Sequence, residues 1–287
     1  MVQACAAGRL IRSGRGPGAV LQPEGGRFLV NEKVFGRVIL YEYPCNERVR
    51  SLLRVEHLFD RLFFFAKGVD VHHHQISVAT LFDLLDICDR TDLRGSVLQD
   101  LERQRVALSA LRQHPGVDPN TLDAMLAQIQ GASSDLGAQG RIGQELRDNE
   151  WLASLRGRIA VPGGSSQVDM PSYFSWQLKP PEQRSVDLKR WITPFMPLYK
   201  GLALILRLLR DSGDVVDVVA RQGAYQEMLG GKIFQLLRVW VDTALAIFPE
   251  MSANKYVIWV RFAAQDRELK PQPVTSDVPF KLARCNI

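Results

Sequence analysis

The first half of the chain carries apolar residues at intervals of three and four positions. This spacing places them on one face of an α-helix and is typical of helices packed on one side. The clearest stripe follows Asn46, a residue type that often caps helices, and comprises Val49, Leu52, Leu53, Val55, Phe59, Leu62 and Phe63. Similar patterns predict helices over residues 76–89, 93–114 and 141–156, and a further helix that opens at Asp118 and Pro119.

Strand-like runs dominate the rest of the chain. Residues 159–164 form a short apolar run and a turn, and residues 168–178 contain three aromatic residues, a type favoured in strands. We therefore expect β-structure to begin here, with one helix around 184–212 and strands over 233–241, 255–262 and 278–282. An early strand over 38–43 ends at Pro44, and we expect it to join the distal sheet.

These elements predict an α+β fold. A mainly helical domain, residues 38–156, is expected to pack on an antiparallel β-sheet or sandwich domain, residues 157–287. Residues 1–37 lack periodic apolar positions and include the turn-prone run Ser13-Gly-Arg-Gly-Pro-Gly18. We expect them to be a disordered basic extension that adds nothing to the core.

Charge and hydropathy narrow the possible functions. The chain has 287 residues and a net charge of +5, but residues 1–37 hold six basic and two acidic residues, a net charge of +4. The nearly neutral body weakens a nucleic-acid-binding interpretation, because that binding needs a clustered basic face. The apolar run around 202–209 is broken by Arg207 and is shorter than the ~20 residues of a membrane span. We expect a cytoplasmic protein without membrane insertion.

Motifs for catalysis or cofactor binding are missing from the sequence. It contains no phosphate-binding glycine loop, no G-x-S-x-G and no H-E-x-x-H, so no catalytic residue and no cofactor is predicted. His72, His73 and His74 are adjacent, and adjacent side chains point in different directions. We expect this run to be a solvated loop or helix start that holds no functional metal.

Two predicted strands combine arginine with tryptophan on one face. Alternation places Arg238 on the same side as Trp240, and Lys255 on the same side as Trp259 and Arg261, opposite Ile258, Val260 and Phe262. Such a face suits an extended peptide with apolar anchors and a carboxylate, through cation–π, bidentate and packing contacts. The alternative is that these arginines only extend from an exposed sheet into solvent.

Several short motifs, in their order and spacing, resemble the ZapD family of Z-ring-associated proteins over about 250 residues, from Val38 onward. They include Glu42-Tyr-Pro-Cys-Asn-Glu47, Leu53-Arg54-Val-Glu56, Leu101-Glu-Arg-Gln104, Arg141-Ile-Gly-Gln-Glu-Leu-Arg147, Pro162-Gly-Gly164, Leu236-Leu-Arg238 and Val260-Arg-Phe262. The resemblance implies a cytoplasmic homodimer at the midcell division ring. It implies that the protein binds the C-terminal tail of the tubulin-like FtsZ and bundles its filaments, and that it is not an enzyme.

The resemblance also implies a binding groove lined by basic residues. The matching candidates for contact with the FtsZ tail are Arg54, Arg147, Arg238 and Arg261, with Arg141, Lys255, Trp240 and Trp259 beside them. We expect Arg54, Arg238 and Arg261 to converge on one groove. Glu150 and Phe174 stand where other members carry basic or polar residues. A small enzyme of unrecognised mechanism and a nucleic-acid-binding adaptor remain the alternative functions.

Overall fold

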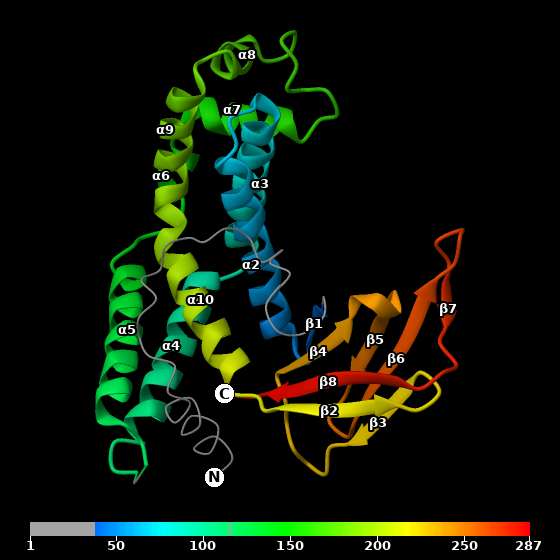
Figure 1. Cartoon of the computed structure of the whole chain (residues 1–287). Helices are drawn as coiled ribbons and strands as arrows, with labels where there is room; N and C mark the ends of the chain where they lie inside the picture. Colours follow the sequence, from blue (N-terminus) through cyan, green and yellow to red (C-terminus); the bar gives the residue numbers. More distant parts are fainter. Residues whose placement is uncertain (1–37, 115) are drawn as a thin grey trace.

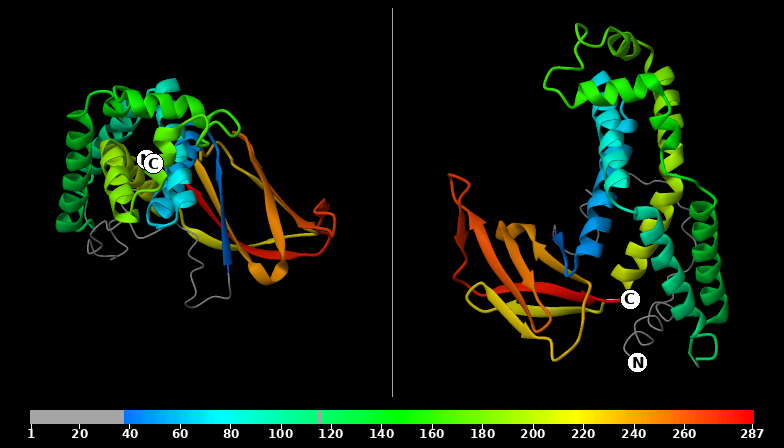
Figure 2. Two further views of the ribbon diagram at one scale, coloured as in Figure 1. Left: turned by 90° about the horizontal axis from the view of Figure 1, so that it is seen from above. Right: turned by 180° about the vertical axis from the view of Figure 1, so that it is seen from behind.

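The computed structural model describes residues 38–114 and 116–287, and these form the predicted α+β fold. Residues 1–37, for which the sequence predicts a disordered basic extension, lie outside this described part. Figure 1 shows the helices stacked in a tall body, with the strands gathered in a sandwich beside its lower end. Both views in Figure 2 keep the strands to one side of the helices.

The described helices are α2 (Glu47–Ala66), α3 (Val71–Arg90), α4 (Leu93–Ser109), α5 (Pro119–Gly137), α6 (Gln144–Arg147), α7 (Glu150–Ile159), α8 (Pro171–Gln177), α9 (Pro181–Ile192) and α10 (Met196–Asp211). Two 3₁₀ helices, η1 (Thr193–Phe195) and η2 (Thr243–Leu245), accompany them. The described strands are β1 (Val38–Pro44), β2 (Val215–Ala220), β3 (Ala224–Met228), β4 (Leu236–Asp242), β5 (Ile247–Ala253), β6 (Val257–Gln265), β7 (Pro271–Pro273) and β8 (Val278–Cys285).

Two helices begin at the caps that the sequence predicts. The side chain of Asn46 accepts a hydrogen bond from the backbone N–H of Val49 at 2.8 Å. Asp118 caps α5 in the same manner, with Pro119 at the first helical position. Each cap satisfies backbone donors that the helix leaves unpaired, a contribution of about 1 kcal/mol. The predicted stripe of α2 is buried in the helical core at Leu52, Val55, Phe59 and Leu62.

Helices α9 and α10 and the short η1 run end to end over residues 181–211. Among the described residues, this run alone is long and apolar enough, by length and composition, to cross a membrane. Its side chains line the helical core, where Leu198, Leu202 and Leu206 are buried. Gly201 permits this packing, because a Cβ there would lie 2.9 Å from a methyl group of Val97.

The strands form two antiparallel sheets, in the orders β1-β4-β8-β2 and β3-β6-β5, and β7 pairs with β6. Val38 lies opposite Asp242 and Pro44 opposite Leu236, so β1 joins the distal sheet as predicted. The core between the sheets is lined by alternate residues of each strand, including Leu237, Val239 and Val241 of β4 and Ile258, Val260 and Phe262 of β6. The predicted alternation in these two strands is therefore confirmed.

The sandwich contacts the helices through the outer face of β4 and β8. Leu236 and Cys285 pack there against Val49 of α2 and Leu209 of α10, and all four residues are buried. These side chains form a small third core, separate from those of the helices and of the sandwich. The first turn of α2 and the last turn of α10 therefore hold the sandwich in place.

The structure corrects three predicted segments. Residues 168–178 contain helix α8 rather than strands, and Trp176 packs on Trp191 of α9 with ring centroids 5.6 Å apart. The segment 159–164 is the end of α7 and a turn, so the strands that follow the helices begin at Val215. The single helix expected over 141–156 is divided into α6 and α7, because Asn149 starts a new helix as its N-cap.

Candidate functional site

The outer face of β5 and β6 carries a shallow pocket. It is lined by Glu250, Met251 and Ser252 of β5 and by Trp259 and Arg261 of β6. The strand register places Glu250 opposite Arg261 and Ser252 opposite Trp259, so these four side chains share the outer face. Trp259 is half-buried and Arg261 is exposed. The pocket therefore combines an aromatic ring with a solvent-facing guanidinium, as the alternation in the sequence predicted.

Arg238 and Trp240 also share a face, but this is the outer face of the other sheet. The guanidinium carbon of Arg238 lies 4.9 Å from the ring centroid of Trp240. Arg238 donates one hydrogen bond to Glu42 at 3.0 Å and one to the carbonyl of Arg210 at 3.3 Å. Because the sandwich core separates the two outer faces, Arg238 does not reach the surface that carries Arg261. The predicted convergence of Arg54, Arg238 and Arg261 is wrong in this respect.

The partners of Arg238 belong to an ionic network between the sandwich and the helices. Arg210 donates hydrogen bonds to Glu42 of β1 and to Glu56 of α2, at distances of 2.6 to 2.8 Å. The Arg210 side chain is only 6% exposed. Burial opposes its charge, but the hydrogen bonds to Glu56 and Glu42 outweigh burial and raise the pKa of Arg210. Sequence reasoning missed this network, because its members are too far apart in the chain to show a pattern.

Arg141 and Arg147 meet at a second acidic centre, Asp89 of α3. Arg147 donates to Asp89 at 2.7 and 3.0 Å, Arg141 at 2.8 Å, and Arg156 at 3.1 Å. Burial opposes the ionisation of Asp89, but the hydrogen bonds from Arg147 and Arg156 outweigh it and lower its pKa. Arg147 also donates to the carbonyl of Ile142 and is 12% exposed. Arg147 therefore holds α6 against α3, whereas Arg141, at 60% exposed, remains accessible.

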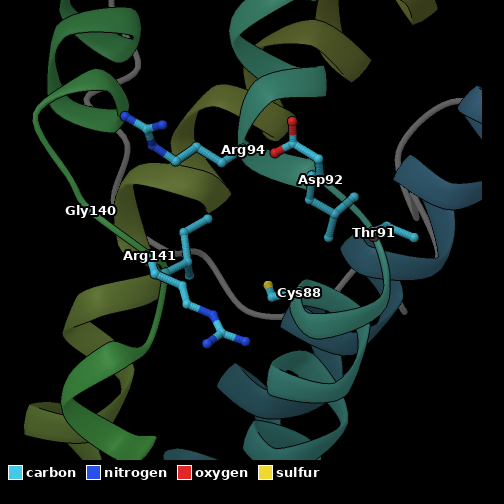
Figure 3. Close-up of a pocket in the computed structure, with 8 residues that line it drawn as sticks. Cys88, Thr91, Asp92, Arg94, Gly140 and Arg141 are labelled. Atoms are coloured by element: carbon cyan, nitrogen blue, oxygen red, sulfur yellow. The ribbon is translucent and has the colours of Figure 1, made fainter.

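A second pocket lies beside this centre, between the start of α4 and the segment before α6. Its lining includes Cys88, Asp92, Arg94 and Arg141. Figure 3 shows the guanidinium groups of Arg94 and Arg141 pointing in different directions. Arg94 donates to the carbonyls of Leu136 and Gly137 at the end of α5, and burial raises the pKa of the Cys88 thiol to about 11. This pocket therefore offers neither a pair of converging cations nor a reactive thiolate.

Arg54 and Lys255, the remaining basic candidates, are surface residues. Arg54 of α2 is 65% exposed, and its nearest carboxylate is that of Glu47 at 3.7 Å. The ammonium of Lys255 lies 4.8 Å from the ring centroid of Tyr256. Such exposed contacts stabilise the fold little, so both cations remain available to an acidic ligand.

The run from His72 to His74 forms the first turn of α3, and its rings do not gather. His74 is buried, with Nε2 2.6 Å from the carbonyl oxygen of Gly68, while the His73 ring lies 5.6 Å from that of Phe65. The expectation of a helix start is confirmed, and that of a solvated run is wrong for His74. Within residues 38–114 and 116–287, no group of three or more metal-binding side chains is placed to hold an ion.

Comparison with known proteins assigns the family. A sequence model for ZapD, described as a cell division protein, matches residues 53–261. The chain belongs to the ZapD family. Its relative in Bordetella pertussis, named Cell division protein ZapD, is 60% identical over 249 residues, which are 87% of this chain and 98% of the relative.

Two other relatives carry the same name. The protein of Bordetella petrii is 59% identical over 249 residues, and that of Ralstonia nicotianae is 47% identical over 251 residues. Each alignment covers 87% of this chain and 100% of the relative. The family match extends across Arg54, the Asp89 centre and the β5–β6 pocket. This ZapD-family chain therefore has a role in cell division.

Proposed function

We propose that this ZapD-family chain binds the C-terminal tail of FtsZ and cross-links FtsZ filaments at the division ring, without catalysing a reaction. The observation that supports it best is the β5–β6 pocket, in which Arg261 is exposed beside the half-buried ring of Trp259. Among the described residues, Arg261 has no ion-pair partner. A guanidinium that forms no ion pair within the described part of the chain is ready to bind a carboxylate of an incoming peptide.

The shape of the pocket favours a peptide over a small substrate. It lies on the open face of a sheet, whereas small-molecule sites are concave and enclose most of the ligand. Trp259 supplies apolar contact area for a side chain of the peptide, and Arg261 supplies directional hydrogen bonds. Together they suit an extended segment with an apolar residue near an acidic one.

The other basic candidates divide into two roles. Arg54, Lys255 and Arg141 are accessible and contribute long-range attraction for an acidic tail. Arg147 and Arg238 are held by Asp89 and Glu42 and act by keeping the fold together. Trp240, which packs at the junction with the helices, belongs with Arg238. The proposed contact site therefore centres on Trp259 and Arg261.

Cross-linking requires two tail-binding sites in one particle. We propose a homodimer, because two equivalent pockets can engage tails on two filaments and convert modest affinity into avidity. Such an adaptor acts in the cytoplasm, where the filaments assemble, and collects at the midcell ring with them.

The test is co-sedimentation with assembled FtsZ. We expect the full chain to pellet with FtsZ filaments and to form bundles, and to remain in the supernatant with FtsZ that lacks its C-terminal tail. The Arg261→Gln variant should pellet less at equal concentration. Equal pelleting with tailless FtsZ would refute tail binding, and binding without bundles would refute cross-linking.

A further inference from the structure

Glu250 faces the same pocket as Arg261, from the neighbouring strand. The two are directly opposite in the β5–β6 register, where opposing Cβ atoms lie about 4.5–5.5 Å apart. Opposite charges at such positions commonly pair. Here both side chains are exposed, and neither forms an ion pair within the described part of the chain. The pocket therefore presents an unpaired cation and an unpaired anion side by side.

We infer that Glu250 binds a basic side chain of the peptide, so that the pocket selects a segment carrying an acidic and a basic residue near an apolar one. This inference rests on the proposed function, since it concerns the same pocket and the same FtsZ tail. Arg261 takes the acidic group, Glu250 the basic group, and Trp259 packs against the apolar residue.

The arrangement explains how the pocket distinguishes charged ligands. A uniformly acidic segment meets repulsion from Glu250, and a uniformly basic one meets repulsion from Arg261. Only a segment with both signs in the right order satisfies both side chains. The order of the charges then fixes the direction in which the peptide lies across β5 and β6.

The residues around the pocket favour a peptide that binds through its side chains over one that pairs as an additional strand. β1 lies beside β5 and covers part of the edge to which a further strand would pair. Pro249, next to Glu250 in β5, also lacks a backbone N–H. The open outer face, where Ser252 and Trp259 form the next cross-strand pair, is therefore the accessible surface for a peptide.

The experiment is a double-mutant cycle by isothermal titration calorimetry. The proteins are the full chain, Glu250→Gln and, as a matched control, Glu182→Gln, an exposed carboxylate of α9 outside the sandwich. The ligands are a synthetic FtsZ tail peptide and a version with its Lys and Arg residues replaced by Gln. We expect that neutralising the basic residues weakens binding to the wild type about fivefold, and equally for Glu182→Gln. For Glu250→Gln the two peptides should bind alike.

The outcomes separate this inference from the proposed function. If the wild type binds the tail but Glu250→Gln still prefers the basic peptide by the same factor, the inference is overturned and tail binding stands. Tighter binding of the natural tail by Glu250→Gln would also overturn it, because Glu250 would then only repel. If the wild type does not bind the tail peptide at all, the proposed function fails, and the inference fails with it.

Discussion

The guanidinium of Arg210 donates two hydrogen bonds to the carboxylate of Glu42, at 2.8 and 2.6 Å. Arg210 lies in the last turn of α10 and Glu42 in β1, so this contact ties the helices to the sandwich. Glu56 of α2 accepts two more hydrogen bonds from the same guanidinium. The buried Arg210 therefore bridges two carboxylates at the junction, and Arg238, which pairs with Glu42, supplies the second positive charge.

Replacing Arg210 with Met is expected to lower the free energy of unfolding by about 3–5 kcal/mol. The reason is that Glu42 and Glu56 would remain partly buried and close together after the loss of Arg210, with Glu42 still paired to Arg238 but Glu56 deprived of its ion-pair partner. Urea denaturation followed by circular dichroism measures the change. The control is Arg221→Met, which breaks the exposed ion pair with Asp277 and should cost less than about 1 kcal/mol. Equal losses in the two variants would contradict the role of the junction.

We expect Arg261→Gln to impair peptide binding and Arg238→Gln to impair stability, although each arginine lies beside a tryptophan. Arg261→Gln should weaken tail-peptide binding about tenfold, because it removes a charge-assisted contact, and leave the melting temperature unchanged. Arg238→Gln should cost about 1–3 kcal/mol of stability through the loss of its bond to Glu42, while the folded variant binds the peptide normally. Titration calorimetry and thermal melts of both variants decide; reversed phenotypes would show that the pocket is misassigned.

The stability of the protein is expected to fall as pH decreases below about 6.5, the ordinary pKa of histidine. Burial lowers the pKa of His74 in the folded state, and the charge of nearby Arg184 of α9 adds to this effect. His73 also lowers the pKa of His74, whereas the carbonyl of Gly68 and the charge of Asp70 raise it. The folded state thus favours the neutral form of His74. The stability that this neutral form contributes is lost as pH falls through the lowered pKa.

His74→Gln tests this dependence, since Gln keeps a donor toward Gly68 without a titrating group. Melting temperatures between pH 8 and pH 5 should fall less steeply for this variant than for the wild type. The exposed His57, replaced in the same manner, serves as the control and should leave the slope unchanged. If the melting temperature of the His74 variant changes with pH as steeply as that of the wild type, His74 is not the origin of the pH dependence.

A chain that begins at Val38 is expected to keep the melting temperature of the full chain and the proposed bundling of FtsZ, because the first 37 residues lack a core pattern. A chain that begins at Cys45 should lose several kcal/mol, since it lacks β1 and with it Glu42. Thermal melts and sedimentation of both chains provide the comparison. A loss of either property in the first chain would disprove the dispensability of residues 1–37.

Local patterns predicted those features that depend on neighbouring residues. The caps at Asn46 and Asp118 and the alternation around Trp259 follow from backbone geometry, which short stretches of sequence encode. The strand predicted over 168–178 failed because tertiary packing overrode β-propensity: Pro171 starts a helix, and Trp176 packs on Trp191. Strand β5 was missed because Pro249 interrupts its pattern, a residue that an edge strand tolerates.

The candidate site was predictable in its residue types but not in its grouping. Alternation identified Trp259 and Arg261 as one surface and Arg238 and Trp240 as another. Whether the two surfaces coincide depends on which sheet each strand joins, and pairing between strands distant in sequence leaves no local signal. Glu250 was not predicted as a pocket residue, because its place opposite Arg261 depends on the strand register, which only the folded structure reveals.

The pairing of β1 with β4 also affects how the chain is made. β1 leaves the ribosome first, but its partner follows about 200 residues later, a delay on the order of ten to forty seconds at typical rates of synthesis. During this interval the helices α2 to α10 can fold around their own core, while β1 has no sheet to join. β8, which pairs with β4, is the last of the described strands to be translated. The sandwich, and with it the proposed tail-binding pocket, is therefore completed only after β8 has been synthesised.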